Sequence, residues 1–209
     1  MGKQVELIMV TENNNNKFYR MCENNDGTWT AVWGRVGASE NTMNYSMDQW
    51  SKKYNEKVKK GYRDISSLRQ EVKTKGFEDV KDSAIKKFLD TLQKYSKQAI
   101  IDNYTVTSAD VTEAQVEKAQ EILNKLSSIA QTKYSNSDVD HYLKDLYMTI
   151  PRRMKNVKDF LLNGDTDTKK KLNAIIQREQ DSVDNMAQQV QLAGKNKSTN
   201  ERAMTLEDA

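Results

Sequence analysis

The stretch Trp29–Gly37 constrains the fold of this chain more than any other segment. Its nine residues include two tryptophans, one arginine and two glycines. The alternation of side chains along a β-strand would place Trp29 and Trp33 on one face of a sheet, and Val32 and Gly34 on the other. The glycines permit backbone conformations that other residues resist. The stretch therefore predicts a strand that ends in a tight turn, with Trp29 in the core.

Arg35 lies between the two glycines of this stretch and close to an indole ring. An arginine held in such a place can offer a rigid fork of hydrogen-bond donors to a phosphate group. Aromatic residues in strands are more often part of a core than of a binding site. On these residues alone, a structural hairpin is the favoured interpretation and a phosphate contact is the alternative.

The flanking sequence predicts further strands. Apolar runs indicate strands at Val5–Val10 and Lys17–Met21, and the stretch above forms a third strand at Thr28–Val36. The segment Asn24–Gly27 contains an Asp-Gly pair, which is typical of a hairpin turn. A fourth short strand is predicted at Thr42–Tyr45. These strands would follow one another as an antiparallel sheet.

A helix is predicted directly after the strands. Met47, Trp50, Tyr54 and Val58 recur at three- and four-residue steps, which is the spacing of one apolar helix face. Gly61 would end this helix, as glycine often does. The sequence therefore predicts one helix packed on the sheet.

The same region carries a run of positive charge. Residues 52–63 include six lysines and arginines but only one acid, Glu56. Clustered lysines and arginines are the electrostatic signature of phosphate binding. A solvated helix face is the alternative and is the favoured one for an isolated run.

The second half of the chain has helical periodicity. A helix is predicted from Asp82 or Ser83, with Ile85 and Phe88 on its apolar face, and a second short helix around residues 99–104. The segment between the sheet and these helices, residues 66–81, is polar and charged, which indicates a linker.

Three longer helices are predicted after residue 110. Thr112 and Gln115 have the spacing of a capping box, so the first of these helices begins there. The second would run from Ser135 until Pro151, the only proline, stops it. The third covers Asp167–Gly194 and would be followed by a polar, mobile tail.

The fold class predicted from these patterns is α+β. A small antiparallel sheet with one packed helix occupies residues 1–65, residues 66–81 form a linker, an all-α bundle occupies residues 82–194, and residues 195–209 form a tail. Hydrophobic residues make up 36% of the 209 residues and charged residues 30%. This composition favours two modest cores over one large core.

The composition also bears on location and chemistry. Cys22 is the only cysteine, so no internal disulfide can form and a reducing interior is expected. No apolar run approaches the roughly 18 residues of a membrane span, so we expect an intracellular protein without membrane contact. The chain contains no P-loop, dinucleotide fingerprint, zinc-ligand spacing or nucleophile elbow. His141, the only histidine, is expected at the surface, so we predict neither a catalytic residue nor a metal ligand.

Two sequence blocks, taken together, resemble a known domain. Asn16–Tyr19 reads Asn-Lys-Phe-Tyr and Trp33–Gly37 reads Trp-Gly-Arg-Val-Gly, and with the strand before them and the helix after them they resemble a WGR domain. The helical half, with its Tyr-x-x-Ile-Pro ending at Tyr147–Pro151, is similar to the helical regulatory domain of the DNA-damage-dependent poly(ADP-ribose) polymerases. The resemblance covers roughly residues 5–192.

The resemblance implies roles for particular residues. Trp33 would stack on the terminal ribose near the 5′ phosphate of a DNA break. Arg35 would link the DNA end to the helical half and so couple the two domains. Asn16 and Lys17 would lie near the DNA backbone. The remaining members of the predicted DNA-binding set are Gly34, Lys57 and Lys60.

The resemblance also implies a function. The chain would be the DNA-strand-break-sensing regulatory portion of a poly(ADP-ribose) polymerase-like protein. It would bind 5′-phosphorylated nicks or ends as a monomer and control the access of NAD to an ADP-ribosyltransferase domain, in cis or in trans. That domain and its His-Tyr-Glu set are absent from this sequence, so NAD is not expected to bind to this chain. In a eukaryotic cell the protein would be nuclear. A stand-alone, non-enzymatic module that binds DNA ends or proteins is the alternative.

Overall fold

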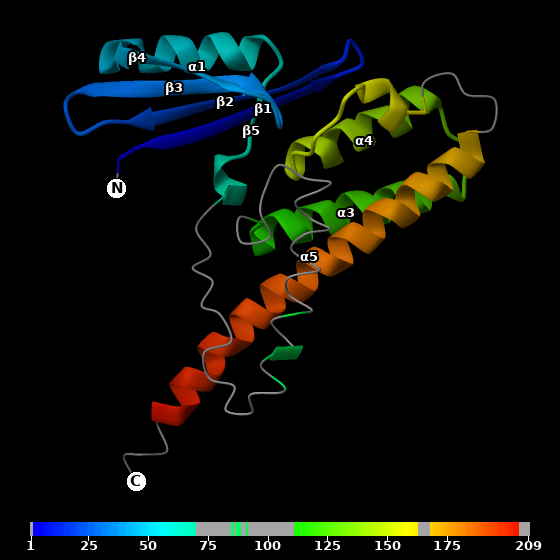
Figure 1. Ribbon diagram of the computed structural model, residues 1–209. Helices are drawn as coiled ribbons and strands as arrows, with labels where there is room; N and C mark the ends of the chain where they lie inside the picture. The colour runs from blue at the N-terminus through cyan, green and yellow to red at the C-terminus, as the bar shows by residue number, and fades with distance from the viewer. Residues whose placement is uncertain are drawn as a thin grey trace.

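A computed structural model describes residues 2–69, 85, 87–88, 91, 111–162 and 168–204. The first of these ranges forms an antiparallel sheet with the strand order β4-β3-β2-β1-β5 (Figure 1). The strands are β1 (Gln4–Thr11), β2 (Asn15–Glu23), β3 (Thr28–Arg35), β4 (Glu40–Ser46) and β5 (Arg63–Asp64). The turns between them use positive φ angles of 59° at Asn14, 80° at Gly27 and 81° at Gly37.

Helices cover both faces of the sheet. Helix α1 lies on one face, and α3, α4 and α5 gather on the other side (Figure 1). The α-helices whose bounds are defined within the described residues are α1 (Trp50–Lys59), α3 (Glu113–Ala130), α4 (Asn136–Thr149) and α5 (Thr168–Met204). Short 3₁₀ helices are η1 (Met47–Gln49), η2 (Ser66–Arg69) and η3 (Val157–Phe160). The predicted fold class, a small antiparallel sheet with one packed helix followed by helices, is confirmed.

The face of the sheet under α1 has its own small core. Trp29 is fully buried there, and its indole stacks on Tyr45 with 4.8 Å between ring centroids. Trp50 of α1 meets the same indole edge-on at 5.3 Å, and the Trp29 Nε1–H group donates to the carbonyl of Ser46 at 3.0 Å. The prediction that Trp29 belongs to the core is confirmed.

The opposite face of the sheet shares a core with the helices. One continuous hydrophobic cluster contains Ile8, Val10, Phe18 and Val36 from the sheet, together with the inward faces of α3, α4 and α5. Ile65, at the predicted domain boundary, is fully buried in the same cluster. The described residues therefore form two cores, and the larger one crosses from the sheet into the helical half.

Helix boundaries follow the local sequence signals in α3 and α4. The Thr112 hydroxyl accepts a hydrogen bond from the Gln115 amide, and the Gln115 side chain closes the capping box as predicted. Helix α4 ends at Thr149, directly before Ile150 and Pro151. Proline at this position cannot continue the helical hydrogen bonds, which explains the end.

Several sequence predictions need correction or lie beyond the described residues. Helix α5 continues through Gly194 to Met204, because one glycine costs only about 1 kcal/mol in a helix and no proline follows it. Val58 is 43% exposed instead of packed, and the short strand β5 was not predicted. Of the helix predicted from Asp82, the described residues are helical, but Ile85 and Phe88 are exposed. The helix predicted at residues 99–104 lies outside the described residues.

Within the part of the chain that the structure describes, none of the helices combines the length and the apolarity that crossing a membrane requires.

Candidate nucleic-acid interface

Lysines and aromatic rings gather where β2, β3 and α1 meet. We call Lys17, Tyr19, Trp33, Lys57 and Tyr62 the basic-aromatic surface. The Lys57 ammonium lies 4.1 Å from the centre of the Tyr19 ring and 5.6 Å from the centre of the Tyr62 ring. Strand pairing sets Tyr19 opposite Trp33, with 6.1 Å between their ring centroids. The two predicted DNA-binding residues Lys17 and Lys57 are thus brought to one region of the molecule with Trp33.

Positive charges are crowded around Lys57. Burial lowers the pKa of Lys57, and the nearby charges of Lys60, Lys53 and Lys17 lower it further, while Glu56 acts in the opposite direction. Burial is also the main reason that the pKa of Tyr19 rises to about 12. An anion bound at this surface would relieve the mutual repulsion of the lysines.

Lys60 lies at the margin of the basic-aromatic surface. Its ammonium donates to the Glu56 carboxylate at 2.6 Å, one helical turn away, and 60% of its side chain is exposed. The carboxylate cancels part of its charge, so Lys60 offers less to a phosphate than Lys17, which makes no ion pair within the described residues.

Trp33 and Trp29 lie in different surroundings although they share one sheet face. Trp33 is only partly buried and packs at the edge of the core that encloses Trp29 completely. Its ring therefore remains available to a partner that approaches along β2 and β3.

Gly34, also predicted to bind DNA, has a clear packing role. A Cβ atom at this position would lie 2.8 Å from the Ser39 carbonyl oxygen and 3.4 Å from the Phe18 ring. Only glycine lets the β3–β4 turn approach its own strand this closely.

The structure places Asn16 differently from the expectation. Its side chain is fully buried, and its Nδ2–H group donates to the carbonyl of Arg152 at 2.9 Å. A completely buried amide cannot reach a DNA backbone, so the predicted direct contact is corrected. The alternation of β2 turns Asn16 toward the helical half, while Lys17 points outward.

Arg35 joins the sheet to the segment after α4. We call residues 152–157 the coupling segment. The Arg35 Nη2 group donates to the carbonyls of Met154 at 2.6 Å and Lys155 at 3.1 Å. The Nη1 group donates to the carbonyl of Asn14 at 2.7 Å. One guanidinium therefore ties the end of β3 to the helical half, while strand pairing sets it opposite Lys17 of the basic-aromatic surface.

Asn14 completes this connection and was missed from the sequence. Its Oδ1 atom accepts hydrogen bonds from Arg35 at 3.0 Å and from the backbone amide of Val157 at 3.0 Å. Asparagine tolerates the left-handed conformation that this turn requires better than other side chains do. Asn14 belongs to a run of four asparagines, but no sequence signal indicated that one of them contacts residue 157.

The coupling segment is in turn anchored to α5. Arg152 and Glu179 form a buried ion pair, with 2.6 Å between Nη1 and Oε1, and both side chains are almost fully shielded from solvent. The Arg152 guanidinium also lies over the Tyr147 ring at 5.0 Å from its centre. A continuous set of polar contacts therefore runs from β3 through the coupling segment to α5.

Other candidate chemistry is sparse. His141 is exposed and lies 3.8 Å from Asp145, one helical turn away. Among the residues that the structure describes, no group of three or more His, Cys, Asp or Glu side chains is arranged to hold a metal ion.

The fold and this surface define an α+β protein whose sheet presents lysines and aromatic rings and is tied by an arginine to a helical half. No family model matches the chain. It is 36% identical over 197 residues to uncharacterized protein 101L of Invertebrate iridescent virus 6, and the match covers 94% of this chain and 80% of the viral protein. The chain belongs to the family of that viral protein.

Proposed function

We propose that this protein binds DNA strand breaks, at 5′-phosphorylated nicks or ends, and transmits binding to its helical half. In this proposal the helical half controls the access of NAD to an ADP-ribosyltransferase domain. The observation that carries the proposal is the position of Arg35. It pairs across the sheet with Lys17 and donates to two carbonyls of the coupling segment.

The basic-aromatic surface supports the DNA-binding part of the proposal. Lysines supply the sequence-independent attraction to phosphates, and exposed aromatic rings stack on sugars or bases. Trp33 is the partly exposed ring beside Tyr19, and Lys57 and Lys17 supply the charge. The resemblance of the two sequence blocks to a WGR domain adds the expectation that Trp33 stacks on the terminal ribose.

The contacts of the coupling segment support the regulatory part. A DNA end that accepts hydrogen bonds from the Arg35 guanidinium would compete for these donors with the carbonyls of Met154 and Lys155. The free energy of that competition would shift the helical half between packed and loosened states. The ion pair of Arg152 with Glu179 extends the effect to α5.

The length of the viral relative favours a transferase in trans, or a module without one. The match leaves about a fifth of that protein uncovered. The transferase domain implied by the resemblance is about as long as this whole chain and would not fit in that remainder. The second candidate function, a stand-alone DNA-end-binding module, is supported by this observation. Either form would act in the nucleus of a eukaryotic cell.

Fluorescence anisotropy with a 5′-phosphorylated nicked hairpin and an intact hairpin tests the proposal. The wild-type protein should prefer the nicked hairpin, and its affinity should fall as salt rises. Trp33→Ala should weaken binding about 5- to 150-fold, which corresponds to the loss of about 1–3 kcal/mol of stacking.

Lys57→Gln should weaken binding and reduce the salt slope by about one. Lys125→Gln removes one exposed charge from α3, away from this surface, and should bind as the wild type does. Equal affinity of the wild type and both surface variants for the nicked hairpin would refute the DNA-binding proposal.

A further inference from the structure

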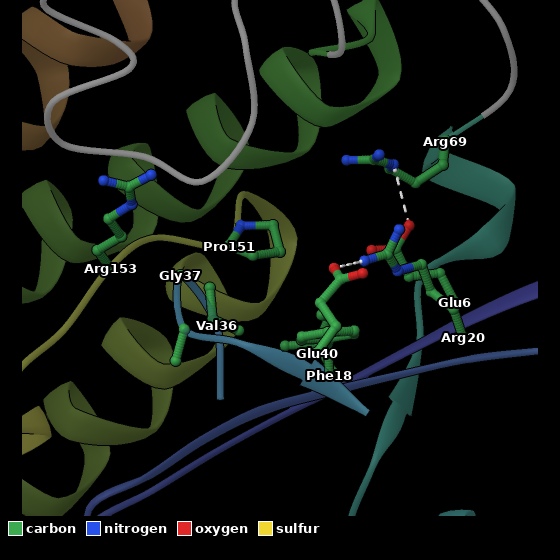
Figure 2. A pocket seen from close by; sticks show the side chains of 11 residues that line it. Glu6, Phe18, Arg20, Val36, Gly37, Glu40, Arg69, Pro151 and Arg153 are labelled. Carbon is green, nitrogen blue, oxygen red and sulfur yellow. Dashed lines mark hydrogen bonds and ion pairs between the residues drawn. The ribbon is translucent and has the colours of Figure 1, made fainter. Parts of the chain in front are cut away.

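We propose that a cleft on the sheet face opposite α1 binds a small phosphorylated molecule. The cleft has a volume of about 410 Å³, within the range of roughly 300–1,000 Å³ that small-molecule sites occupy. It lies over β1 and β2, between the β3–β4 turn, η2 and the residues that follow α4 (Figure 2). It shares no side chain with the basic-aromatic surface, so the inference does not rest on the function proposed above.

Three arginines from separate parts of the chain line this cleft. Arg20 comes from β2, Arg69 from η2 and Arg153 from the coupling segment. Figure 2 shows the guanidinium groups of Arg69 and Arg153 on opposite sides of Pro151 in this view. Guanidinium groups match the geometry of phosphate oxygens better than ammonium groups do. The three arginines therefore reach the lining of the cleft from three separate parts of the chain.

Two carboxylates partly balance these arginines. Glu40 forms an ion pair with Arg20, and Glu6 accepts from Arg69 Nε at 3.2 Å (Figure 2). Arg153 is exposed and has neither an ion pair nor a hydrogen bond to another described residue. Among the described residues that line the cleft, the charge of Arg153 is therefore the one without a carboxylate partner.

Unused hydrogen-bond donors also point to an anionic ligand. Arg20 Nε and Arg69 Nη1 are buried and make no hydrogen bond within the described part of the chain. A buried donor without a partner costs about 1–3 kcal/mol. A phosphate in the cleft would bring several acceptor oxygens close to these arginines.

The floor of the cleft limits the kind of molecule that fits. Phe18 is 7% exposed and Ile8 is 1% exposed, so little apolar surface is open to a ligand. The Arg20 guanidinium lies 4.7 Å from the centre of the Phe18 ring, which holds its plane in place. The ligand should therefore be compact and mainly polar, such as pyrophosphate or the phosphate end of a nucleoside monophosphate.

Binding there would also hold the sheet to the helical half. Arg20 and Arg69 belong to the sheet side of the cleft. Arg153 directly follows Arg152, whose carbonyl accepts a hydrogen bond from Asn16 of β2. A phosphate contacted from both sides would strengthen this junction. Ligand binding should therefore raise the melting temperature.

Isothermal titration calorimetry with pyrophosphate and with adenosine 5′-monophosphate, at constant ionic strength, tests the inference. The full chain should bind at least one of the two, and Arg153→Gln should weaken that binding about 10- to 100-fold, the loss of one charge-assisted contact. Arg153 is exposed, so the variant should fold, and circular dichroism checks this. Lys125→Gln is the control for charge and should bind as the wild type does.

Two results would overturn the inference. One is the absence of heat with both probes in the wild type. The other is probe binding that is equally strong in the wild type and in Arg153→Gln. If Lys57→Gln loses binding in that case, the anion binds at the basic-aromatic surface and not in the cleft. The DNA assay described above uses neither probe, so failure of one proposal does not imply failure of the other.

Discussion

The two faces of the sheet are both partly buried, but in different ways. Under α1, a small aromatic core around Trp29 is bordered by partly exposed rings and lysines. On the opposite face, apolar residues merge with three helices, and buried polar groups such as Asn16 bond to the coupling segment. The first face can meet a partner at its border, while the second holds the molecule together. Arg35, at the end of β3, bonds to the coupling segment and pairs across the sheet with Lys17 of the basic-aromatic surface.

The largest expected effect separates the two tryptophans of β3. Trp29→Ala removes a fully buried indole and should cost about 3–5 kcal/mol of unfolding free energy. Trp33→Ala removes a partly exposed ring and should cost about 1 kcal/mol. Urea denaturation followed by circular dichroism measures both values. Similar losses for the two variants would show that Trp33 is a core residue, which would weaken its proposed role at DNA.

The next effect concerns the buried ion pair on the helical side. Glu179→Ala leaves the Arg152 guanidinium buried without its carboxylate, which should cost about 3 kcal/mol or more. The double variant Arg152→Met with Glu179→Leu removes both charges and should recover much of that loss, since apolar replacements of buried pairs are often well tolerated. Urea denaturation of the wild type, the single variant and the double variant gives the free energies of unfolding to compare. A double variant as unstable as the single one would contradict the view that the loss of the Glu179 carboxylate beside the buried arginine is the cause.

A smaller loss of stability is expected from a substitution at Gly34 than from the two changes above. Gly34→Ala places a Cβ within 2.8 Å of the Ser39 carbonyl and should cost about 1–3 kcal/mol. Gly27 has open space around it and a positive φ angle. Asparagine tolerates positive φ, so Gly27→Asn serves as the control and should change stability little. Thermal denaturation distinguishes the two variants. Full stability of Gly34→Ala would mean that the turn moves freely and that the close approach is unimportant.

The smallest effect is on the pH dependence of DNA binding. The pKa of Lys57 is lowered, mainly by burial, so its ammonium loses its proton at a lower pH than an ordinary lysine does. Its attraction for phosphate should therefore decline first as the solution becomes alkaline. Lys57→Arg, which stays charged, should bind the nicked hairpin with a weaker pH dependence as the pH rises toward about 10.4, the ordinary pKa of lysine. Identical pH profiles for the wild type and Lys57→Arg would contradict a phosphate contact made by a Lys57 whose pKa is lowered.

The sequence predicted the framework of the fold because its signals were local. The alternation around Trp29, the Asp-Gly turn and the capping box at Thr112 each act over a few residues, and the structure confirms them. The polar contacts between the halves could not be predicted in this way. Asn14 and Val157 share a hydrogen bond although they lie 143 positions apart in the sequence, and only the packed tertiary structure brings them together.

Contacts between distant parts of the chain also limited what the sequence could predict about the candidate site. Alternation along β2 could have indicated that Asn16 and Lys17 point in opposite directions, but the resemblance assigned both to DNA. Arg152 and Glu179 carried no motif, and nothing in the sequence indicated that they form a buried pair. The role of Arg35 as a link was implied by the resemblance, and the partners that it uses, the carbonyls of Met154 and Lys155, are visible only in the structure.

Amide hydrogen exchange with and without the nicked hairpin is the most direct test of coupling between the two sides of the molecule. We predict that DNA protects β2 and β3 and speeds exchange in the coupling segment and the α5 turn around Glu179, because Arg35 releases its carbonyl partners. In Arg35→Ala, the protection of β2 and β3 should remain at saturating DNA while the change in the helical half disappears. Unchanged exchange in the helical half of the wild type, with clear protection of the sheet, would contradict the coupling.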